Sequence, residues 1–395
     1  MMGNSVMASG VTGDADLLDG AGKLTEQLRA RASEASSSGT LPDDVVLALE
    51  SAGMFRLGLP KGLGGFEADP MTLVVTAEKL AYADGSAAWA TMTGNSSMFF
   101  AWLDQDVASS LLDGRPGQPV ASSFAPSGRG VEDGGGFRIS GRWSYVSGSS
   151  HAAMILLAFM VAGPDGSPRM VDGRPLMRWA VLPSADVAVQ QTWADAAGLR
   201  GSGSHDVIVE DVFVPAERTL MPFFEPPRAE GALYRMPFFT GVRSLLVGIP
   251  LGLARRALDE LTILIQHKTR EMAPLVQDQD VQVRLAEAEA SLRAGRHFVL
   301  DATDRTWASV RSSDTVSLPL RTEYTLAAQF AMRSAVQAVN LAFEIAGVSS
   351  ALVNDAIGQC WRDVNVASQH IAFSRNRWRG AGQALLGVDV DPFYL

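Results

Sequence analysis

The segment Ser140-Gly-Arg-Trp-Ser-Tyr-Val-Ser-Gly-Ser-Ser-His-Ala152 is the most informative part of this 395-residue sequence. It combines a strand-like run with a turn that is rich in glycine and serine. A second segment, Gly198-Leu-Arg-Gly-Ser-Gly-Ser-His-Asp206, has the same character and leads into the apolar run Val207-Ile-Val-Glu-Asp-Val-Phe213. Both segments therefore predict β-structure in the middle of the chain.

Helical patterns lie on both sides of this middle region. Apolar residues recur at helical spacing from Leu17 to Leu28, Pro70 begins a helix that is predicted to run through Tyr82, and Gly347 is positioned to stop a long helix near the other end. Between the helical regions, five short β-type runs bounded by Gly, Pro and Asp turns are typical of a compact antiparallel sheet or barrel. These runs are residues 120–124, 136–139, 153–159, 179–182 and 207–213. We expect an α+β fold that is mostly helical. Its predicted parts are a flexible leader (residues 1–13), an N-terminal helical domain (14–117), a middle β-domain (118–228) and a C-terminal helical bundle (229–395).

The composition argues against several classes of function. A formal net charge of −10 disfavours nucleic acid, because phosphate binding needs a concentrated basic surface. The single cysteine, Cys360, rules out a disulfide framework, and the five histidines show no metal-ligand spacing. The longest apolar run, residues 152–163, is shorter than the roughly 20 residues of a membrane helix, and the first ten residues do not resemble a signal peptide. We therefore expect a soluble cytoplasmic protein that binds no metal or nucleic acid and does not associate with a membrane.

Two further motifs complete a pattern that extends over nearly the whole chain. Leu57-Gly-Leu-Pro-Lys-Gly-Leu-Gly-Gly65 lies in the N-terminal part, and Asp211-Val-Phe-Val-Pro215 closes the β-domain. Together with the two serine- and glycine-rich segments, in this order, they resemble the acyl-CoA dehydrogenase superfamily. The resemblance is closest to its two-component, reduced-flavin-utilising monooxygenases, and among these to indole-, indoleacetate- and phenol-oxidising members. It implies a four-helix bundle, a homotetramer, and a flavin held between β-domain and bundle, partly across a subunit boundary.

The catalytic glutamate of the dehydrogenases is missing from both of its usual places. In that family it follows a C-terminal Arg-Asp pair or lies in the first long helix of the bundle. Here Arg362-Asp363 is followed by residues 364–372 without a glutamate, and residues 241–252 contain no acid. A dehydrogenase needs such a carboxylate to remove the α-proton of its substrate. The sequence therefore favours the oxygenase branch.

The oxygenase branch implies a reaction and its partners. A separate NAD(P)H:flavin reductase would supply reduced FMN or FAD, and O2 would add to the flavin to give a C4a-hydroperoxyflavin. One oxygen atom would then pass to a small aromatic or heteroaromatic substrate that is indole-, phenol- or polyketide-like. The cavity must exclude water, because solvent access releases hydrogen peroxide unproductively. Three alternatives stay open: an acyl-CoA dehydrogenase with a displaced base, an amine N-hydroxylase on the same fold, and a catalytically silent flavin-binding homologue.

The resemblance implies two catalytic residues. His370 lies where a dehydrogenase would carry its glutamate, and an imidazole there can deliver the proton that completes the hydroperoxide. Ser147 matches a serine near flavin N5, where a hydroxyl can either donate or accept a hydrogen bond. From the residues alone, His370 is more often a helix-face histidine, and Ser147 is equally a turn serine at a strand end.

Further residues are implied as contacts for the cofactor and the substrate. The loop around Phe124 matches one that meets the polar edge of the flavin, and Arg270 stands where the family places a basic residue for the flavin phosphate. Glu271-Met-Ala273 replaces the usual Arg-x-x-Phe pattern for a full dinucleotide, which favours FMN over FAD. Trp143 either walls the cavity or is a core tryptophan. The implied cofactor contacts are Ser123, Phe124, Ser127, Trp143, Ser147, Gly148 and Arg270, and the implied substrate contacts are Asn95, Trp143 and His370.

Overall fold

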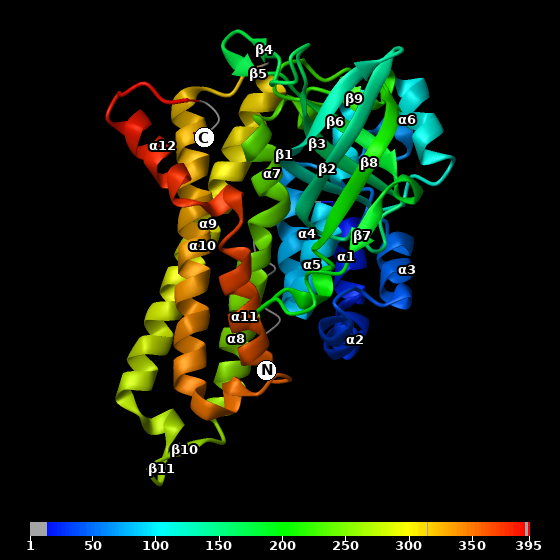
Figure 1. The fold of residues 1–395 in the computed structure, drawn as a ribbon. Coiled ribbons are helices and arrows are strands. Elements are labelled where there is room, and N and C mark those ends of the chain that lie inside the picture. Colours follow the sequence, from blue (N-terminus) through cyan, green and yellow to red (C-terminus); the bar gives the residue numbers. More distant parts are fainter. Residues whose placement is uncertain (1–13, 314, 392–393) are drawn as a thin grey trace.

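The computed structural model describes residues 14–313, 315–391 and 394–395, and Figure 1 shows their arrangement. Helices come first along the chain, a sheet follows, and helices return from Phe238 onward. This order confirms the expected α+β, mostly helical fold with a β-region between two helical regions. The predicted flexible leader, residues 1–13, lies outside the described residues.

Helices form the N-terminal part, and their ends follow the signals in the sequence. Asp69 caps α4, and Pro70 occupies its first turn, where the missing N–H of proline costs nothing. The helix predicted from Pro70 through Tyr82 is confirmed, and it extends by one residue. The helices are α1 (Ala15–Lys23), α2 (Thr25–Ser38), α3 (Asp43–Ser51), α4 (Pro70–Ala83), α5 (Gly85–Thr93) and α6 (Gln105–Leu112), with the 3-10 helix η2 (Ser96–Trp102) after α5.

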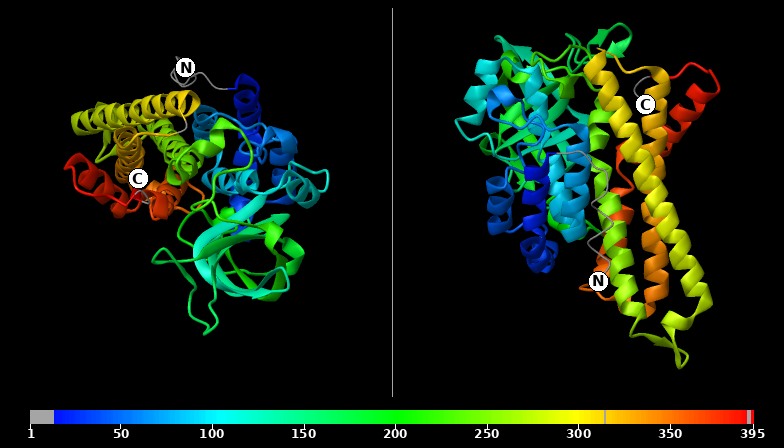
Figure 2. Two further views of the ribbon diagram at one scale, coloured as in Figure 1. Left: turned by 90° about the horizontal axis from the view of Figure 1, so that it is seen from above. Right: turned by 180° about the vertical axis from the view of Figure 1, so that it is seen from behind.

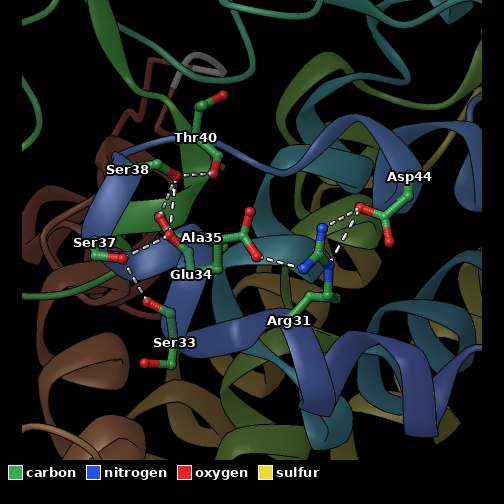
Figure 3. Close-up of polar contacts among 8 residues, drawn as sticks. All are labelled: Arg31, Ser33, Glu34, Ala35, Ser37, Ser38, Thr40 and Asp44. Carbon is green, nitrogen blue, oxygen red and sulfur yellow. Dashed lines mark hydrogen bonds and ion pairs between the residues drawn. The ribbon is translucent and has the colours of Figure 1, made fainter.

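Polar contacts at the surface orient the end of α2 and the start of α3, as Figure 3 shows. The guanidinium of Arg31 on α2 donates from Nη2 to Oδ1 of Asp44 on α3 over 2.8 Å. The hydroxyl of Ser38 donates to the carbonyl oxygen of Thr40 over 2.9 Å, across Gly39, which ends α2 with a φ of 75°. Exposed ion pairs contribute little to stability, so these contacts set the direction of the chain rather than hold the fold together.

A seven-stranded sheet forms the middle part, in the order β7-β8-β2-β1-β3-β6-β9. The five β-type runs predicted from the sequence are confirmed as β1, β2, β3, β6 and β8. Inward-facing side chains of these strands form their own apolar core, which includes Trp143 and Phe159. The strands of the sheet are β1 (Val120–Asp133), β2 (Gly136–Val146), β3 (Met154–Val161), β6 (Met177–Pro183), β7 (Ala188–Gln190), β8 (His205–Pro215) and β9 (Thr219–Leu220), and β4 (Met170–Val171) pairs with β5 (Arg174–Pro175) in a separate hairpin.

The sheet is mixed, which corrects the expectation of an antiparallel one. Strand β2 pairs antiparallel with β1 on one side and with β8 on the other. The next strand, β3, reverses the direction of β2 but lies on the free side of β1, so β1 and β3 run parallel. Residues 147–153 connect β2 to β3. The serine- and glycine-rich segment that ends in Ala152 therefore passes over the end of β1.

Long helices form the C-terminal part and stand beside both the sheet and the N-terminal helices (Figure 1, Figure 2). Gly347 ends α10 with a φ of 62°, as the sequence predicts. The hairpin of β10 (Thr269–Arg270) and β11 (Ala273–Pro274) lies at the end of the bundle that points away from the sheet (Figure 1). The helices are α7 (Phe238–Leu246), α8 (Gly248–Ile265), α9 (Gln279–Ser312), α10 (Leu318–Ala346), α11 (Ala356–Ala367) and α12 (Arg375–Leu385).

The stretch Phe238–Ile265, which contains α7 and α8, is by composition long and apolar enough to cross a membrane. However, 89% of its apolar window is buried inside the protein. Its apolar character is therefore explained by packing in the middle of the bundle.

A buried carboxyl group joins the bundle to the β-domain. Asp363 on α11 is 3% exposed, and its Oδ1 accepts a hydrogen bond from the backbone N–H of Leu199 over 2.6 Å. The neighbouring Gly198 leaves no space for a side chain, because a Cβ there would lie 2.3 Å from the carbonyl oxygen of Arg362. Burial and, to a smaller extent, the nearby carboxyl of Asp84 raise the pKa of Asp363 to about 7. The loop before β8 is thus held against α11 by an acid that resists ionisation.

We predict that Asp363→Asn flattens the pH dependence of stability. Because the pKa of Asp363 is raised in the folded state, its contribution is complete below about pH 4 and is lost as the pH rises through about 7. A shift of this size corresponds to about 4 kcal/mol. Asparagine keeps the acceptor for Leu199 without the ionisation, so the variant should lose less stability than the parent between pH 5 and pH 8 in thermal unfolding.

Asp304→Asn, at an exposed position on α9, is the matched control and should keep the parental slope. An unchanged slope in Asp363→Asn would contradict the prediction. Some slope should remain in the variant, because burial also raises the pKa of Asp84.

Candidate active site

Ser147 and His370 meet at a single side chain, Trp89 of α5. Ser147 lies in the turn after β2, is 7% exposed, and accepts a hydrogen bond at Oγ from the indole Nε1 of Trp89 over 3.0 Å. His370 lies between α11 and the short helix η9 (Ile371–Phe373), and its ring meets the same indole edge-on, with centroids 5.4 Å apart. The structure therefore brings together the two side chains that the sequence singles out as catalytic.

The surroundings of His370 set its protonation state. The backbone N–H of Ala372 donates to Nδ1 of His370 over 3.3 Å, which caps η9. Burial and, to a smaller extent, the positive charge of Arg377 lower the pKa of His370 to about 4. The ring is therefore neutral at pH 7, and its proton is on Nε2 because Nδ1 is the acceptor. His370 offers a hydrogen-bond donor rather than a cation.

A chain of serine hydroxyls extends from Ser147 into the loop before β8. Ser147 Oγ lies 2.8 Å from Ser204 Oγ, which lies 2.7 Å from Ser202 Oγ. The backbone N–H of Gly148 donates to the carbonyl oxygen of Ser202 over 2.8 Å, so the two polar turns are also joined through the main chain. Gly148 has a φ of 75°, and a Cβ there would lie 3.2 Å from Nε2 of His151. Both constraints favour glycine beside the hydroxyl chain.

Strand β1 is irregular at the loop that is expected to meet the flavin. Its register with β3 shifts between Ser123 and Gly128, so residues 124–127 lie outside the ladder that joins the two strands. Ser123 is buried, Phe124 is half-buried and Ser127 is exposed. Backbone groups that are not used in a ladder are available to a polar ligand. This bulge therefore fits the polar edge of a flavin, as does the nearly buried hydroxyl of Ser147.

Aromatic side chains gather beside this bulge. The rings of Phe99, Phe124 and Phe238 contact one another, with centroids 5.1–5.5 Å apart. A cavity of about 40 Å³ adjoins them, and its lining includes Trp102 and Tyr234. Phe99 and Trp102 belong to η2, which directly follows the helix that carries Trp89. An apolar cavity with aromatic walls and a few polar groups nearby suits a flat ring system.

Trp143 lies in the core of the β-domain, which corrects its predicted contact with the cofactor or the substrate. The residue is fully buried, and its Nε1 donates to the carbonyl oxygen of Ala158 over 2.6 Å. Gly128 makes room for the ring, because a Cβ there would lie 2.1 Å from it. The alternation of side chains along β2 turns Trp143 inward. Of the two interpretations that the sequence allowed, a cavity wall or a core tryptophan, the structure shows the core tryptophan.

Asn95 is also placed as a structural residue rather than beside the candidate catalytic groups. It is fully buried between α5 and η2, where the helical backbone is interrupted. Its Nδ2 donates to the carbonyl oxygens of Met54 and Thr91 over 2.7 and 2.9 Å, and its Oδ1 accepts from the N–H of Gly58 over 3.2 Å. The amide satisfies three backbone groups, two in the loop after α3 and one on α5, so the predicted substrate contact has no support.

Arg270 is not brought to Ser147 within one chain. It lies on the exposed hairpin at the far end of the bundle (Figure 1, Figure 2), where its Nη2 donates to the carbonyl oxygen of Ile345 over 3.1 Å. A role for Arg270 in binding a flavin phosphate therefore requires a second copy of the chain.

The sequence did not identify Trp89, Ser202 or Ser204 as site residues. Trp89 stands in an apolar helix, where a tryptophan gives the same signal as any core residue. The two serines belong to the segment that begins at Gly198, which was interpreted as a turn that feeds β8. Their contact with Ser147 depends on the pairing of β2 with β8, which local sequence does not specify.

Carboxylates and metal ligands are not part of this arrangement. In the portion of the chain that the structure covers, the hydrogen bonds of Ser147, Trp89 and His370 involve no carboxylate. The raised pKa of Asp363 does not make it a base for a substrate, because a Cβ on Gly85 would lie only 2.7 Å from its Oδ2. Among the same residues, no three His, Cys, Asp or Glu side chains form a group that could hold a metal.

Comparisons with known proteins agree with this geometry. Two family models match, the acyl-CoA dehydrogenase N-terminal domain over residues 20–105 and the acyl-CoA dehydrogenase C-terminal domain over residues 245–375. The indole-3-acetate monooxygenase of Pseudomonas putida is 32% identical, over 99% of this chain and 97% of that relative. The flavin-dependent monooxygenase oxygenase subunit HsaA of Rhodococcus jostii is 29% identical, over 88% of this chain and 92% of its own length.

A solved structure has the same fold. The 3-HSA hydroxylase from Rhodococcus sp. RHA1 superposes with a TM-score of 0.87 at 26% identity, over 97% of this chain and 99% of that one. The chain therefore belongs to the acyl-CoA dehydrogenase superfamily and, within it, to the flavin-dependent monooxygenases.

Proposed function

We propose that this chain is the oxygenase component of a two-component system. It takes reduced flavin from a separate NAD(P)H:flavin reductase and uses O2 to oxygenate a small aromatic or heteroaromatic substrate such as an indole or a phenol. The observation that supports this most is the meeting of Ser147 and His370 at Trp89. A cavity with aromatic walls is lined in part by η2, the short helix that follows the one carrying Trp89. The names of the two relatives, an indole-3-acetate monooxygenase and an oxygenase subunit, support the substrate class and the separate reductase.

Several residues would hold the flavin, which when bound supplies the electrons that activate O2. Ser123 and the bulge at residues 124–127 offer main-chain and hydroxyl groups, and Ser147 offers a hydroxyl next to Gly148, whose own N–H is bonded to Ser202. The exposed hairpin that carries Arg270 would reach a flavin phosphate from another subunit of a homotetramer. We favour FMN over FAD, because Glu271, Met272 and Ala273 provide no second cation there. A cytoplasmic location fits a protein that depends on NAD(P)H.

His370 would act as a hydrogen-bond donor to oxygen at this site. As a neutral ring with its proton on Nε2, it can donate a hydrogen bond to a negatively charged oxygen without first taking up a proton. Its Nδ1 is engaged by Ala372, so a role as base would require breaking the cap of η9. Donation from a neutral imidazole also adds no net positive charge to the site.

The aromatic cavity would select the substrate. Its volume of about 40 Å³ is smaller than the space that drug-sized ligands occupy in proteins, about 300–1,000 Å³. Met98 and Met236 lie in its walls, and methionine side chains adapt their shape readily. We expect these side chains to move when a ring enters, so that the closed cavity excludes water before oxygen is transferred.

The alternative of an acyl-CoA dehydrogenase has less support. That reaction needs a carboxylate beside the substrate, whereas Asp363 is packed against Gly85 and Leu199. Residues 241–252, the other expected place for a base, contain no acid.

The proposed reaction predicts the origin of the product oxygen. With a flavin reductase, NADH and indole, the protein should form an oxygenated product that carries one atom of ¹⁸O when the reaction runs under ¹⁸O2. Reductase alone is the control for unspecific oxidation. Absence of labelled product over a panel of indoles and phenols, together with reduction of bound flavin by acyl-CoA substrates, would favour the dehydrogenase instead.

Replacing His370 by asparagine should lower the activity without destabilising the fold. Asparagine can accept from the N–H of Ala372 and keep the cap of η9, but its shorter side chain places no donor where Nε2 of the imidazole lies. Product formation should fall by roughly 10- to 10²-fold, the effect of losing one hydrogen bond to a charged oxygen, while reduced flavin still binds and the melting temperature changes little. His297→Asn, at an exposed position on α9, should retain full activity.

The pH profile provides a second check on His370. Its pKa is lowered to about 4, so the neutral donor should persist as the pH falls and be lost only near pH 4–5. An activity that declines as the pH rises through 6–7 would instead indicate a cationic imidazole with an ordinary pKa, and the proposed role would be wrong.

A further inference from the structure

We propose that Trp89 is a positioning residue whose indole fixes the Ser147 hydroxyl and the His370 imidazole relative to each other. The inference rests on the proposed function, which gives these two side chains their roles. Trp89 acts through the two groups that it holds, and Ser204 and Ser202 complete the arrangement from the other side of Ser147.

Trp89 is itself held in place by the helices around it. It is 6% exposed and lies on α5, whose N-cap residue Asp84 accepts at Oδ1 from the N–H of Ala87 over 2.7 Å. The second oxygen of Asp84 accepts from Nε2 of Gln359 over 3.0 Å, and Gln359 lies on α11, the helix that leads to His370. The helix that carries Trp89 and the helix that precedes His370 are therefore tied together directly.

The hydrogen bond between Trp89 and Ser147 has only one direction. An indole N–H donates and never accepts, so Ser147 always accepts from Trp89. On its other side, Ser147 contacts Ser204, which contacts Ser202 in turn, and hydroxyl groups can rotate to donate or to accept. Ser147 therefore has one fixed partner and one adaptable partner. This arrangement suits a ligand atom that accepts a hydrogen bond in one redox state and donates it in another, as flavin N5 does.

The hydrogen bonds around Ser147 are shielded from water because their partners are buried. Ser202 and Ser204 are 0% and 3% exposed, so water does not replace a hydrogen bond that is lost within the chain. The contact of the indole with the ring of His370 likewise covers part of the imidazole, which is half-buried. A smaller side chain at position 89 would admit water and return the pKa of His370 toward its ordinary value near 6.5.

Two substitutions of Trp89 separate its two contacts. Trp89→Phe keeps a ring beside His370 but removes the N–H that holds Ser147, so hydrogen peroxide released per product should rise about fivefold, the effect of one hydrogen bond. Trp89→Leu removes both contacts, so the pKa of His370 should in addition rise by a unit or more, measured by NMR of its ring in the flavin-free protein. Ser204→Ala should raise peroxide release as Trp89→Phe does and leave the pKa of His370 unchanged.

Trp143→Phe is the matched control, because it removes an indole hydrogen bond of the same kind inside the β-core. It should lower the melting temperature without changing peroxide release or the pKa of His370. If Trp89→Phe and Ser204→Ala release no more peroxide than this control, the proposed positioning of Ser147 is wrong. If Trp89→Leu folds and the pKa of His370 does not move, the proposed positioning of His370 is wrong.

Two measurements keep this test separate from the proposed function. If the parent protein forms no oxygenated product, the proposed function fails, but the titration of His370 in the flavin-free variants still decides its contact with Trp89. The indole N–H resonance of Trp89, identified by its loss in Trp89→Phe, should shift in Ser147→Ala as the acceptor is removed. An unshifted resonance would refute the hydrogen bond on which the proposal depends.

Discussion

The hydrogen bond from Trp89 to Ser147 is the contact on which the candidate site depends. It joins the N-terminal helices to the turn between β2 and β3, and the same indole contacts His370 at the end of α11. All three regions of the chain therefore meet at one side chain. Because Trp89 and Ser147 are both more than nine-tenths buried, a bond lost there would not be replaced by water.

The order of strands explains how this contact arises. The pairing of β2 with β8 places the turn at Ser147 next to the loop that carries Ser202 and Ser204. That loop is held from the other side by Asp363 of α11. Helix α11 thus supports the site in two ways. Asp363 holds the loop that carries Ser202 and Ser204, and the chain continues from the end of the helix to His370. The stability of this interface and the geometry of the site are coupled through one helix.

The sequence predicted the architecture well because its signals are local. These local signals each span a few residues: Pro70 at a helix start, Gly347 at a helix end, and the five β-type runs. The order of the motifs along the chain predicted the arrangement of the helical and β regions. The expectation of an antiparallel sheet was wrong, because β1 and β3 pair in parallel and a strand's partners depend on the whole sheet. The family resemblance implied Trp143 and Asn95 as site residues, whereas burial and hydrogen bonds to the backbone place them in the scaffold.

For the candidate site, the sequence supplied Ser147 and His370 but not what joins them. Trp89 gives no signal beyond that of an apolar helix, and Ser202 and Ser204 read as an ordinary turn. Their significance arises only when three distant segments are packed together. The catalytic roles of Ser147 and His370 stay predictions, while their common contact with Trp89 is a feature of the fold.

The central claim is that this scaffold directs reduced flavin toward oxygen transfer rather than toward substrate oxidation. Rapid mixing of the protein–reduced flavin complex with O2, followed by absorbance, tests it most directly. The account predicts a transient species whose spectrum differs from both reduced and oxidised flavin and whose decay is matched by product when substrate is present. Direct conversion of reduced to oxidised flavin in one phase, with one hydrogen peroxide released per flavin, would contradict it.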